Sequence, residues 1–206
     1  MALLELDDVS KAFGSLKAVD GVSFKVEAGE IFGIAGPNGS GKSTLFNIIT
    51  GIPFGPDRGR IRFDGTAING KSGHAIARLG LARTFQRETS FDGLTVFENA
   101  LIGASYGKQE KAAATAREAA AEALEFVGLG SASFGRLAGE LSVFERKCLM
   151  LATAIAMQPR MLLLDEPASS LTKPEIETSI GLIRRTAERG ITILLIEHVL
   201  TFLMSL

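Results

Sequence analysis

The sequence predicts an α/β fold, in which helices cover both faces of a parallel sheet and a mainly helical segment is inserted. Short apolar runs typical of buried strands alternate along the chain with helical patterns, as in sheets whose two faces are both buried. From Val96 to Met157 helical signals dominate, and the inserted segment spans roughly residues 88–156. With 206 residues, the chain is long enough for one domain that carries a smaller lobe.

The first predicted elements are half-buried strands. Leu4 and Leu6, and later Val22, Phe24 and Val26, alternate with polar neighbours. A period of two residues is the pattern of a strand with one buried face. We therefore expect strands in the N-terminal part of the chain.

The next elements follow the order strand, glycine-rich loop, helix. Ile31–Ala35 is an apolar run that ends in a glycine-rich turn, and Lys42–Thr50 has a helical pattern. This order is the supersecondary unit of phosphate-binding loops. Gly59–Asp64 is predicted to form another strand, closed by a turn at the pair Asp64-Gly65.

The remaining elements are helices and two further buried strands. Helical signals run through Val96–Met157, where Lys111–Val127 is rich in Ala and Glu and is followed by a glycine that stops the helix. Met161–Leu164 and Ile191–Ile196 are predicted to be buried strands. Between them, Pro174–Arg189 has a helical pattern with proline in its first turn.

Composition and charge exclude a class of protein. The chain is 46% hydrophobic and 22% charged, as in ordinary globular proteins. Its 22 basic and 23 acidic residues give a formal net charge of −1, so a nucleic-acid binder that relies on a strong basic field is not expected. The single cysteine lies in the apolar stretch Cys148–Met157, and we expect a buried, unreactive thiol in a reducing compartment.

Membrane contact is expected only through partner proteins. The N-terminus carries acids where a signal peptide needs basic residues. The longest apolar tract near the end, Ile191–Leu206, is interrupted by Glu197 and His198. It is also shorter than the roughly 20 residues of a membrane span.

A phosphate-binding loop follows the strand Ile31–Ala35. Residues 36–43 match the pattern G-x-x-x-x-G-K-[ST]. The glycines let successive backbone N–H groups face an anion, and the following helix adds the positive end of its dipole. Lys42 supplies a positive charge to the β- and γ-phosphates, and the Ser43 hydroxyl can ligate Mg²⁺. The predicted phosphate-binding residues are Gly36, Pro37, Asn38, Gly39, Ser40, Gly41, Lys42, Ser43 and Thr44.

Two acidic residues follow the strand Met161–Leu164. In parallel sheets ligands gather at the carboxyl ends of the strands, so Asp165 and Glu166 are expected beside the phosphate loop. Asp165 would hold a magnesium ion, and Glu166 would orient or deprotonate the attacking water. The sequence therefore predicts a site for ATP and Mg²⁺.

With these motifs, the chain resembles the ABC ATPase family along nearly its whole length. The resemblance implies three further site residues. Phe13 would stack on adenine, and Gln86, in the segment Ala82–Gln86, would reach magnesium and sense a transmembrane partner. His198 would contact the γ-phosphate and, with Lys42, Gln86 and Glu166, make up the catalytic set.

The resemblance also implies the division of the chain. We expect a P-loop NTPase (RecA-like) core with an N-terminal antiparallel β lobe and a helical insertion lobe, all within a single nucleotide-binding domain. Residues 1–87 and 157–206 would form the core with its β lobe, and residues 88–156 would form the helical lobe.

Three segments resemble the ATP-binding subunits of branched-chain amino-acid importers: Gly80–Gln86, Leu94–Asn99 and Ile196–His198. The resemblance implies an ATPase that powers the import of branched-chain amino acids or similar small solutes, which other subunits recognise. It implies a second ATP-binding subunit and transmembrane permease subunits as partners. It also implies a peripheral place at the cytoplasmic face of the inner (plasma) membrane.

The segment Leu141–Glu145 departs from the family pattern. In the family, Leu-Ser-Gly-Gly-Gln meets the γ-phosphate of ATP bound by the opposite subunit. Here Phe144 replaces a glycine that permits close backbone approach, and Glu145 places a negative charge where an anion should dock. Ser142-x-x-Glu145 is also a capping-box pattern, which would occupy the donors of the helix start and partly cancel its field.

Two more departures follow. Ser169–Thr172 stands where the family usually ends in Asp or Asn, so communication between subunits is not expected to follow the family pattern. The chain ends at Leu206, soon after His198, whereas family members continue. A fragment, a truncated form and a degenerate gene product all remain open.

Two functions fit these observations. The first is ATP hydrolysis that drives import, in a heterodimer whose partner contributes an intact signature segment. The second is a non-hydrolysing, nucleotide-gated binding module, which the altered signature favours and which Glu166 and His198 oppose. An ABC protein of DNA repair or translation is disfavoured because the chain has neither a long insertion nor tandem cassettes. A small P-loop kinase would leave residues 82–86 and 196–198 unexplained.

Overall fold

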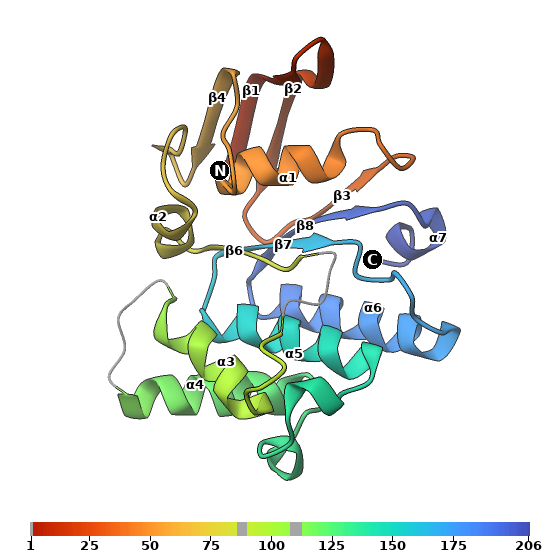
Figure 1. The fold of residues 1–206 in the computed structure, drawn as a ribbon. Helices are drawn as coiled ribbons and strands as arrows, with labels where there is room; N and C mark the ends of the chain where they lie inside the picture. The colour runs from red at the N-terminus through yellow and green to blue at the C-terminus, as the bar shows by residue number, and fades with distance from the viewer. Residues whose placement is uncertain (1, 86–89, 108–112) are drawn as a thin grey trace.

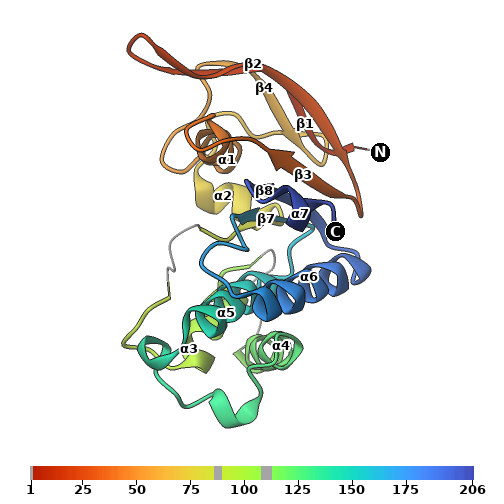
Figure 2. The same cartoon turned by 90° about the vertical axis from the view of Figure 1, so that its right-hand side faces the viewer.

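Two sheets and a set of helices form the layers of the chain (Figures 1 and 2). The computed structural model describes residues 2–85, 90–107 and 113–206. An antiparallel sheet lies at one end, a parallel sheet crosses the middle, and helices fill the other end (Figure 2). The predicted α/β fold with an antiparallel β lobe and a helical insertion is confirmed. The exact lobe boundaries at residues 87/88 and 156/157 stay a prediction.

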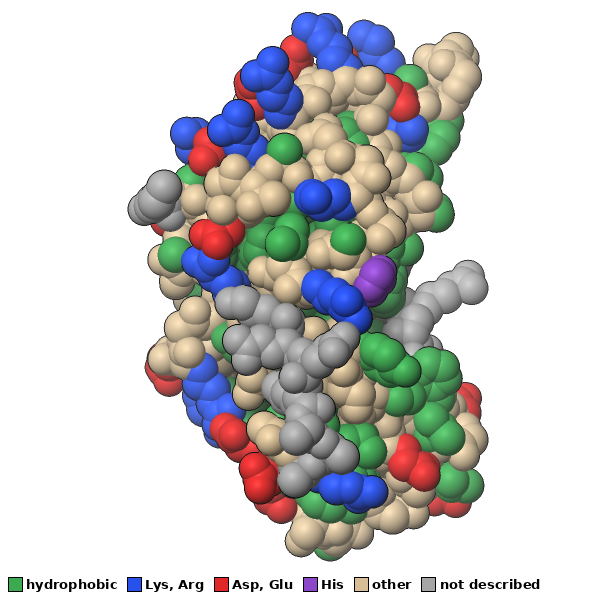
Figure 3. Space-filling view, turned by 90° about the vertical axis from the view of Figure 1, so that its left-hand side faces the viewer, with side chains coloured by type: hydrophobic (Ala, Val, Ile, Leu, Met, Phe, Trp, Pro, Cys, Tyr) green, Lys and Arg blue, Asp and Glu red, His purple; other side chains and the backbone are tan. Residues whose placement is uncertain are grey.

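The antiparallel sheet contains the half-buried strands expected from the alternating pattern. Leu4 and Leu6 are buried, whereas Arg58, Arg60 and Arg62 point outward from the neighbouring strand. On the face shown in Figure 3, basic side chains gather at this end of the molecule. In spatial order the strands are β2 (Leu16–Glu27), β1 (Ala2–Phe13), β4 (Arg58–Phe63) and β5 (Thr66–Ala67).

The parallel sheet contains the three predicted apolar strands and a short one that the pattern did not predict. In β7, Met161 and Leu163 pack toward the antiparallel sheet, whereas Leu162 and Leu164 pack toward the helices. Helices and strands therefore cover both faces, which is why the whole strand is apolar up to its last residue. In spatial order the strands are β3 (Ile31–Ala35), β8 (Thr192–Glu197), β7 (Met161–Asp165) and the unpredicted β6 (Leu81–Arg83).

The helices lie on both sides of the parallel sheet. Helix α1 (Lys42–Thr50) lies between the two sheets, and α5 (Val143–Ala156) and α6 (Lys173–Glu188) cover the opposite face (Figures 1 and 2). Packed beyond them are α3 (Val96–Ser105) and α4 (Ala113–Phe126), and the smaller helices are α2 (Gly73–Arg78) and α7 (Leu200–Leu203). Two short 3₁₀ turns, Ser131–Ser133 and Ala138–Glu140, connect α4 to α5.

Two hydrophobic cores follow from this layering. The first, the upper core, fills the space between the antiparallel sheet, α1 and the face of the parallel sheet that is turned toward them. The second, the lower core, joins the opposite face of the parallel sheet to α3, α4, α5 and α6. It contains Cys148, which is buried as predicted. Within the described ranges, none of the helices is both long and apolar enough to span a bilayer.

Candidate functional site

The parallel strands bring the predicted motifs to one edge of the sheet. Ala35 at the end of β3 pairs with Glu197 at the end of β8, and Asp165 at the end of β7 pairs with Ile196. The phosphate loop, the acidic pair and His198 therefore all leave the sheet at its carboxyl edge, where ligands gather in open α/β sheets.

A hollow of about 520 Å³ opens over the glycine-rich loop. Phe13 and Glu166 border it from elements far away in the sequence. The arrangement can accommodate a ligand of nucleotide size. Its lining residues are Phe13, Leu16, Lys17, Ala18, Asn38, Gly39, Ser40, Gly41, Lys42, Ser43, Thr44 and Glu166.

The backbone of the loop requires glycine at position 41. Gly41 has φ +89°, and a Cβ atom there would lie 2.0 Å from the carbonyl oxygen of Ala18. Gly41 is also the residue before α1, and no side chain caps this helix start. The first-turn N–H groups of α1 have no carbonyl partner within the helix, so they are donors for an anion in the hollow.

Lys42 places a positive charge against the loop. Its side chain is buried, and Nζ donates to the carbonyl oxygens of Gly36 (2.7 Å) and Pro37 (2.8 Å). The residue that follows, Ser43, is exposed and lines the hollow. An ammonium, a hydroxyl and helix-start amides therefore face the same space.

Asp165 is held by an arginine that the sequence reasoning did not single out. Its side chain is 2% exposed, and its Oδ2 accepts a hydrogen bond of 2.7 Å from Nη2 of Arg83 on β6. Burial raises the pKa of the Asp165 carboxyl, and the Arg83 guanidinium acts in the opposite direction. Arg83 belongs to the predicted segment 82–86. Its partner Asp165 lies 82 residues away, so no local sequence pattern indicates that the two side chains pair.

The donor set at this edge fits a magnesium ion. The second carboxylate oxygen of Asp165, Oδ1, is buried and has no hydrogen-bond partner in the part of the chain that the structure describes. Oxygen ligands, one or two from the protein and the rest from phosphates and water, are what Mg²⁺ takes in nucleotide sites. Ser43 and Asp165 are the protein groups that would hold it.

Glu166 lies at the edge of the hollow in an uncommon backbone conformation. Its φ is +49°, and its backbone N–H donates to the carbonyl oxygen of Ile196 on the neighbouring strand. Non-glycine residues held in the left-handed region cost of order 1–3 kcal/mol and cluster at functional sites. Lys147 Nζ contacts the Glu166 carbonyl oxygen (3.4 Å) and Ser169 Oγ (3.1 Å), which supports this turn from α5.

Glu197 connects the two loops that leave β7 and β8. Its side chain is fully buried, with Oε1 accepting from Ala168 N (2.7 Å) and Oε2 from His198 N (3.1 Å). The side chain of His198 is 45% exposed, and it is not among the residues that line the hollow. Sequence reasoning named Glu197 as an interruption of an apolar tract and within the segment Ile196–His198, but it gave the side chain no role of its own.

Of the residues implied by the resemblance, Phe13 is described by the structure and Gln86 is not. Phe13, at the end of β1, is 44% exposed and makes an edge contact with Phe54 at 5.2 Å between ring centroids. It is therefore a surface aromatic beside the hollow rather than a core residue. Gln86 lies outside the described residues.

The helix start at the altered signature segment is capped by its own side chains. Glu145 N donates to Ser142 Oγ (3.2 Å), and Ser142 N donates to Glu145 Oε2 (2.8 Å), so the predicted capping box is confirmed. Arg136 contacts Glu145 Oε1 at 2.6 Å and holds the pKa of that carboxyl below its usual range, with Ser142 N–H adding to the effect. The glutamate therefore stays charged, and the start of α5 is a poor anion site.

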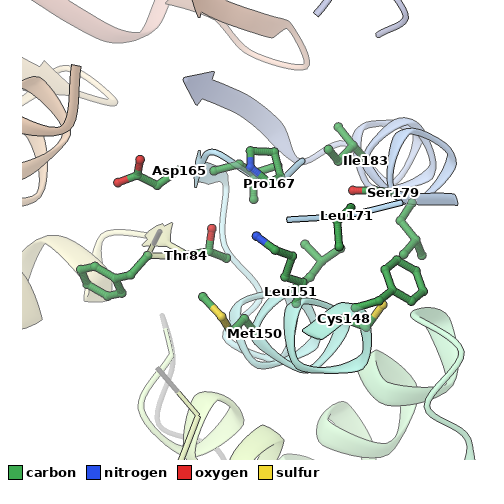
Figure 4. Close-up of a pocket in the computed structure, with 14 residues that line it drawn as sticks. Thr84, Cys148, Met150, Leu151, Asp165, Pro167, Leu171, Ser179 and Ile183 are labelled. Carbon is green, nitrogen blue, oxygen red and sulfur yellow. The ribbon is translucent and has the colours of Figure 1, made fainter. Parts of the chain in front are cut away.

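Phe144 points to the interior side of the same helix. It is partly buried against the lower core and lines a small cavity of about 40 Å³ between α5, α6 and the loop after β7 (Figure 4). Pro167 and Leu171 border that cavity from the loop after β7, and Asp165 borders it from the end of the strand (Figure 4). The large side chain replaces the glycine of the family pattern and packs against the core that contains residues of both helices.

The segment Ser169–Thr172 leads into the next helix. Ser170 has φ +62°, and Thr172 precedes α6. Glu175 Oε2 accepts from both the backbone N and the hydroxyl of Thr172, at 2.7 and 2.6 Å. The pattern Thr-x-x-Glu was available in the sequence as a helix-start signal, and the sequence reasoning did not use it.

A glycine-rich loop between a parallel strand and a helix, with an acidic residue at the end of a second parallel strand, defines a P-loop nucleotide-binding protein. The family model described as ABC transporter matches residues 19–169. The chain belongs to the ABC transporter family, whose ATP-binding cassettes are ATPases.

Relatives and solved structures agree with this family. The chain is 38% identical to the high-affinity branched-chain amino acid transport ATP-binding protein BraF of Pseudomonas aeruginosa, over 99% of this chain and 85% of that protein. It is 35% identical to the probable branched-chain amino acid transport ATP-binding protein LivG of Methanocaldococcus jannaschii, over 100% and 83%. The ADP conformation of the cassette MJ1267 superimposes with a TM-score of 0.86 at 36% identity, over 98% of this chain and 85% of that chain.

Proposed function

We propose that this chain binds and hydrolyses ATP to power an importer of branched-chain amino acids or similar small solutes. The names of BraF and LivG support the solute class. The observation that carries the proposal is the meeting of Lys42, Ser43 and Glu166 around one hollow, with Asp165 at the adjoining strand end.

The positions of the residues around the hollow support their proposed roles, and the family resemblance supplies those of His198 and Gln86. The amides of the loop and Lys42 would hold the β- and γ-phosphates, while Phe13 would stack on the adenine. Magnesium bound by Ser43 and Asp165 would neutralise the charge on the phosphates. Glu166 would orient or deprotonate the attacking water. His198 would contact the γ-phosphate, and Gln86 would reach the metal and report on the permease.

We propose that the working unit is a pair of cassettes docked on transmembrane permease subunits, at the cytoplasmic face of the inner (plasma) membrane. The self-capped start of α5 supports a heterodimer. In such a pair, the ATP bound by this chain would meet the intact signature of the partner. The ATP bound by the partner would meet Phe144 and Glu145 and form the weaker site.

The experiment is ATP turnover by the assembled complex, with the unmodified chain and with Glu166→Gln. Loss of most of the turnover in the variant, with ATP binding retained, is the expected result. Lys42→Ala should weaken ATP binding itself, as calorimetry with Mg²⁺ and ATP would report. Equal turnover with and without Glu166 would instead favour a non-hydrolysing, nucleotide-gated module, the function that the altered signature also supports.

The proposed heterodimer also predicts the ATP turnover of the isolated chain. Without a partner signature, the purified chain should hydrolyse ATP far more slowly than the assembled complex. Turnover by the chain alone at the rate of the complex would contradict the asymmetric pair while leaving the ATPase proposal intact.

A further inference from the structure

Arg83 joins three elements of the proposed nucleotide site. Its side chain is 6% exposed, with Nη2 donating to Asp165 Oδ2 at 2.7 Å on β7. Its other terminal nitrogen, Nη1, donates to Asn47 Oδ1 at 2.8 Å and to Thr50 Oγ1 at 3.4 Å on α1. One guanidinium on β6 therefore links the strand that carries the metal-holding carboxylate to the helix that follows the phosphate loop.

Aromatic rings restrict the guanidinium further. The rings of Phe46 and Phe85 lie with their centroids 5.4 and 4.9 Å from Arg83 Cζ, within the range of cation–π contacts. Arginine is suited to such a place because its planar fork stacks on rings while it donates in fixed directions. Arg83 is thus held by contacts other than the ion pair.

The ion pair uses only one oxygen of the carboxylate. An arginine commonly binds a carboxylate through two parallel hydrogen bonds, but here the fork is divided between Asp165 and Asn47. Asp165 Oδ1 stays buried and without a hydrogen-bond partner among the described residues. Replacing a buried ion pair by apolar residues is often neutral or stabilising, so folding stability alone is a weak reason for this arrangement.

We infer that Arg83 is a positioning residue for the magnesium ion: by holding Asp165 Oδ2 and the α1 side chain Asn47 together, it sets Asp165 Oδ1 in a fixed relation to Ser43. This inference rests on the proposed function. Ser43 lies in the first turn of α1, and Asn47 lies one turn later on the same helix. The bridge therefore joins the two protein groups of the metal site through rigid elements, which is how outer partners orient metal ligands.

The test is the magnesium dependence of ATP binding by the full purified chain, measured by calorimetry in EDTA and across a series of MgCl₂ concentrations. Arg83→Gln keeps a polar side chain and removes the charged fork. It should raise the Mg²⁺ concentration for half-maximal enhancement of ATP binding about tenfold or more, the usual cost of losing an outer partner of a metal ligand. Affinity for ATP in EDTA should stay within about twofold, because the phosphate loop is intact.

Two further variants sharpen the result. Arg83→Lys keeps the charge but not the fork and should give an intermediate Mg²⁺ dependence. Arg160→Gln is the matched control. Arg160 forms an ion pair with Asp64 and directly precedes β7, so it lies at the opposite end of this strand from Asp165. Its replacement should leave the Mg²⁺ dependence unchanged. If Arg83→Gln does not fold, Asn47→Ala decides, because it removes the α1 anchor without leaving Asp165 unpaired, and it should shift the Mg²⁺ dependence in the same direction.

An unchanged Mg²⁺ dependence in Arg83→Gln, or in Asn47→Ala where Arg83→Gln does not fold, would overturn the positioning role. Equal weakening of ATP binding with and without Mg²⁺ would also overturn it, because that outcome describes a residue that only supports the fold. Failure of the unmodified chain to bind ATP under either condition would contradict the proposed function instead, and it is recognisable before any variant is measured.

Discussion

At the scale of single residues, the phosphate loop depends on a glycine that no other residue can replace without strain. Gly41→Ala should lower the free energy of unfolding by more than Gly39→Ala. Both positions have positive φ, at +89° and +79°, and share the cost of about 1–2 kcal/mol for a left-handed alanine. Only at Gly41 would the new Cβ also collide with Ala18 O, whereas nothing lies within 4 Å at Gly39.

Urea unfolding of the two variants without nucleotide measures this difference. Gly39→Ala is the matched control, since it has the same backbone penalty in the same loop. A larger loss of stability in Gly39→Ala than in Gly41→Ala would show that the contact with Ala18 does not shape the loop.

Cys148 should be unreactive in the folded chain. Burial raises the pKa of its thiol to about 12, with the charges of Glu145 and Glu175 acting in the same direction. At pH 8 the thiol is therefore protonated. Its thiolate fraction is about a thousandfold lower than that of a thiol with the ordinary pKa of 9.0 at the same pH. A chromogenic disulfide reagent should label the native chain slowly and the urea-unfolded chain fast. Rapid stoichiometric labelling of the native chain would contradict both the burial and the raised pKa.

Residue roles could be predicted where the signal is local. The loop residues around Lys42 are adjacent in sequence, and their chemistry needs no distant partner to be recognised. Arg83 and Glu197 were missed because their hydrogen bonds reach across 82 and 29 residues. A sequence pattern shows that a charge is present, but the folded chain decides which charge it meets.

At the scale of elements, the start of α5 is stabilised by its own side chains. Ser142→Ala should lower the free energy of unfolding by about 1 kcal/mol, because the Glu145 N–H would lose its acceptor. Ser131→Ala is a suitable control, since the Ser131 hydroxyl makes no hydrogen bond within the described chain and is exposed. Equal unfolding midpoints for the two variants in urea would show that the capping box contributes no stability.

The long elements were predictable and the short ones were not. Strand β3 and helix α1 match their predicted ranges, because an apolar run and a glycine-rich turn mark them clearly. Strand β6 has three residues and is defined only by its pairing with β7. Helices α2 and α7 are also too short to show a period in the sequence.

At the scale of the whole molecule, the surface around α5 sets how two cassettes can meet. Restoring the family residues with Phe144→Gly and Glu145→Gln should strengthen ATP-dependent pairing, because the helix start would regain an approachable backbone and lose a negative charge. The measurement is the mass of the purified chain with and without Mg²⁺ and ATP, by light scattering, in a Glu166→Gln background that preserves bound ATP.

Phe144 also packs against the lower core, so the single change Glu145→Gln serves as the milder variant. It should give part of the effect without opening the cavity between α5 and α6. If ATP produces no added dimer in either variant, the altered signature is not what limits pairing. The unmodified chain should stay monomeric under the same conditions.

The sequence by itself determined the fold class, the phosphate loop and the acidic strand end, because each depends on hydrophobic periodicity or on residues that are neighbours in the chain. Only the tertiary structure decided that Asp165 shares an arginine with α1, that Glu197 ties two loops together, and that Arg136 forms an ion pair with Glu145 at the signature helix. These contacts form between segments that the sheet brings to one edge. Their physical cause is the packing of the whole chain, which no local pattern contains.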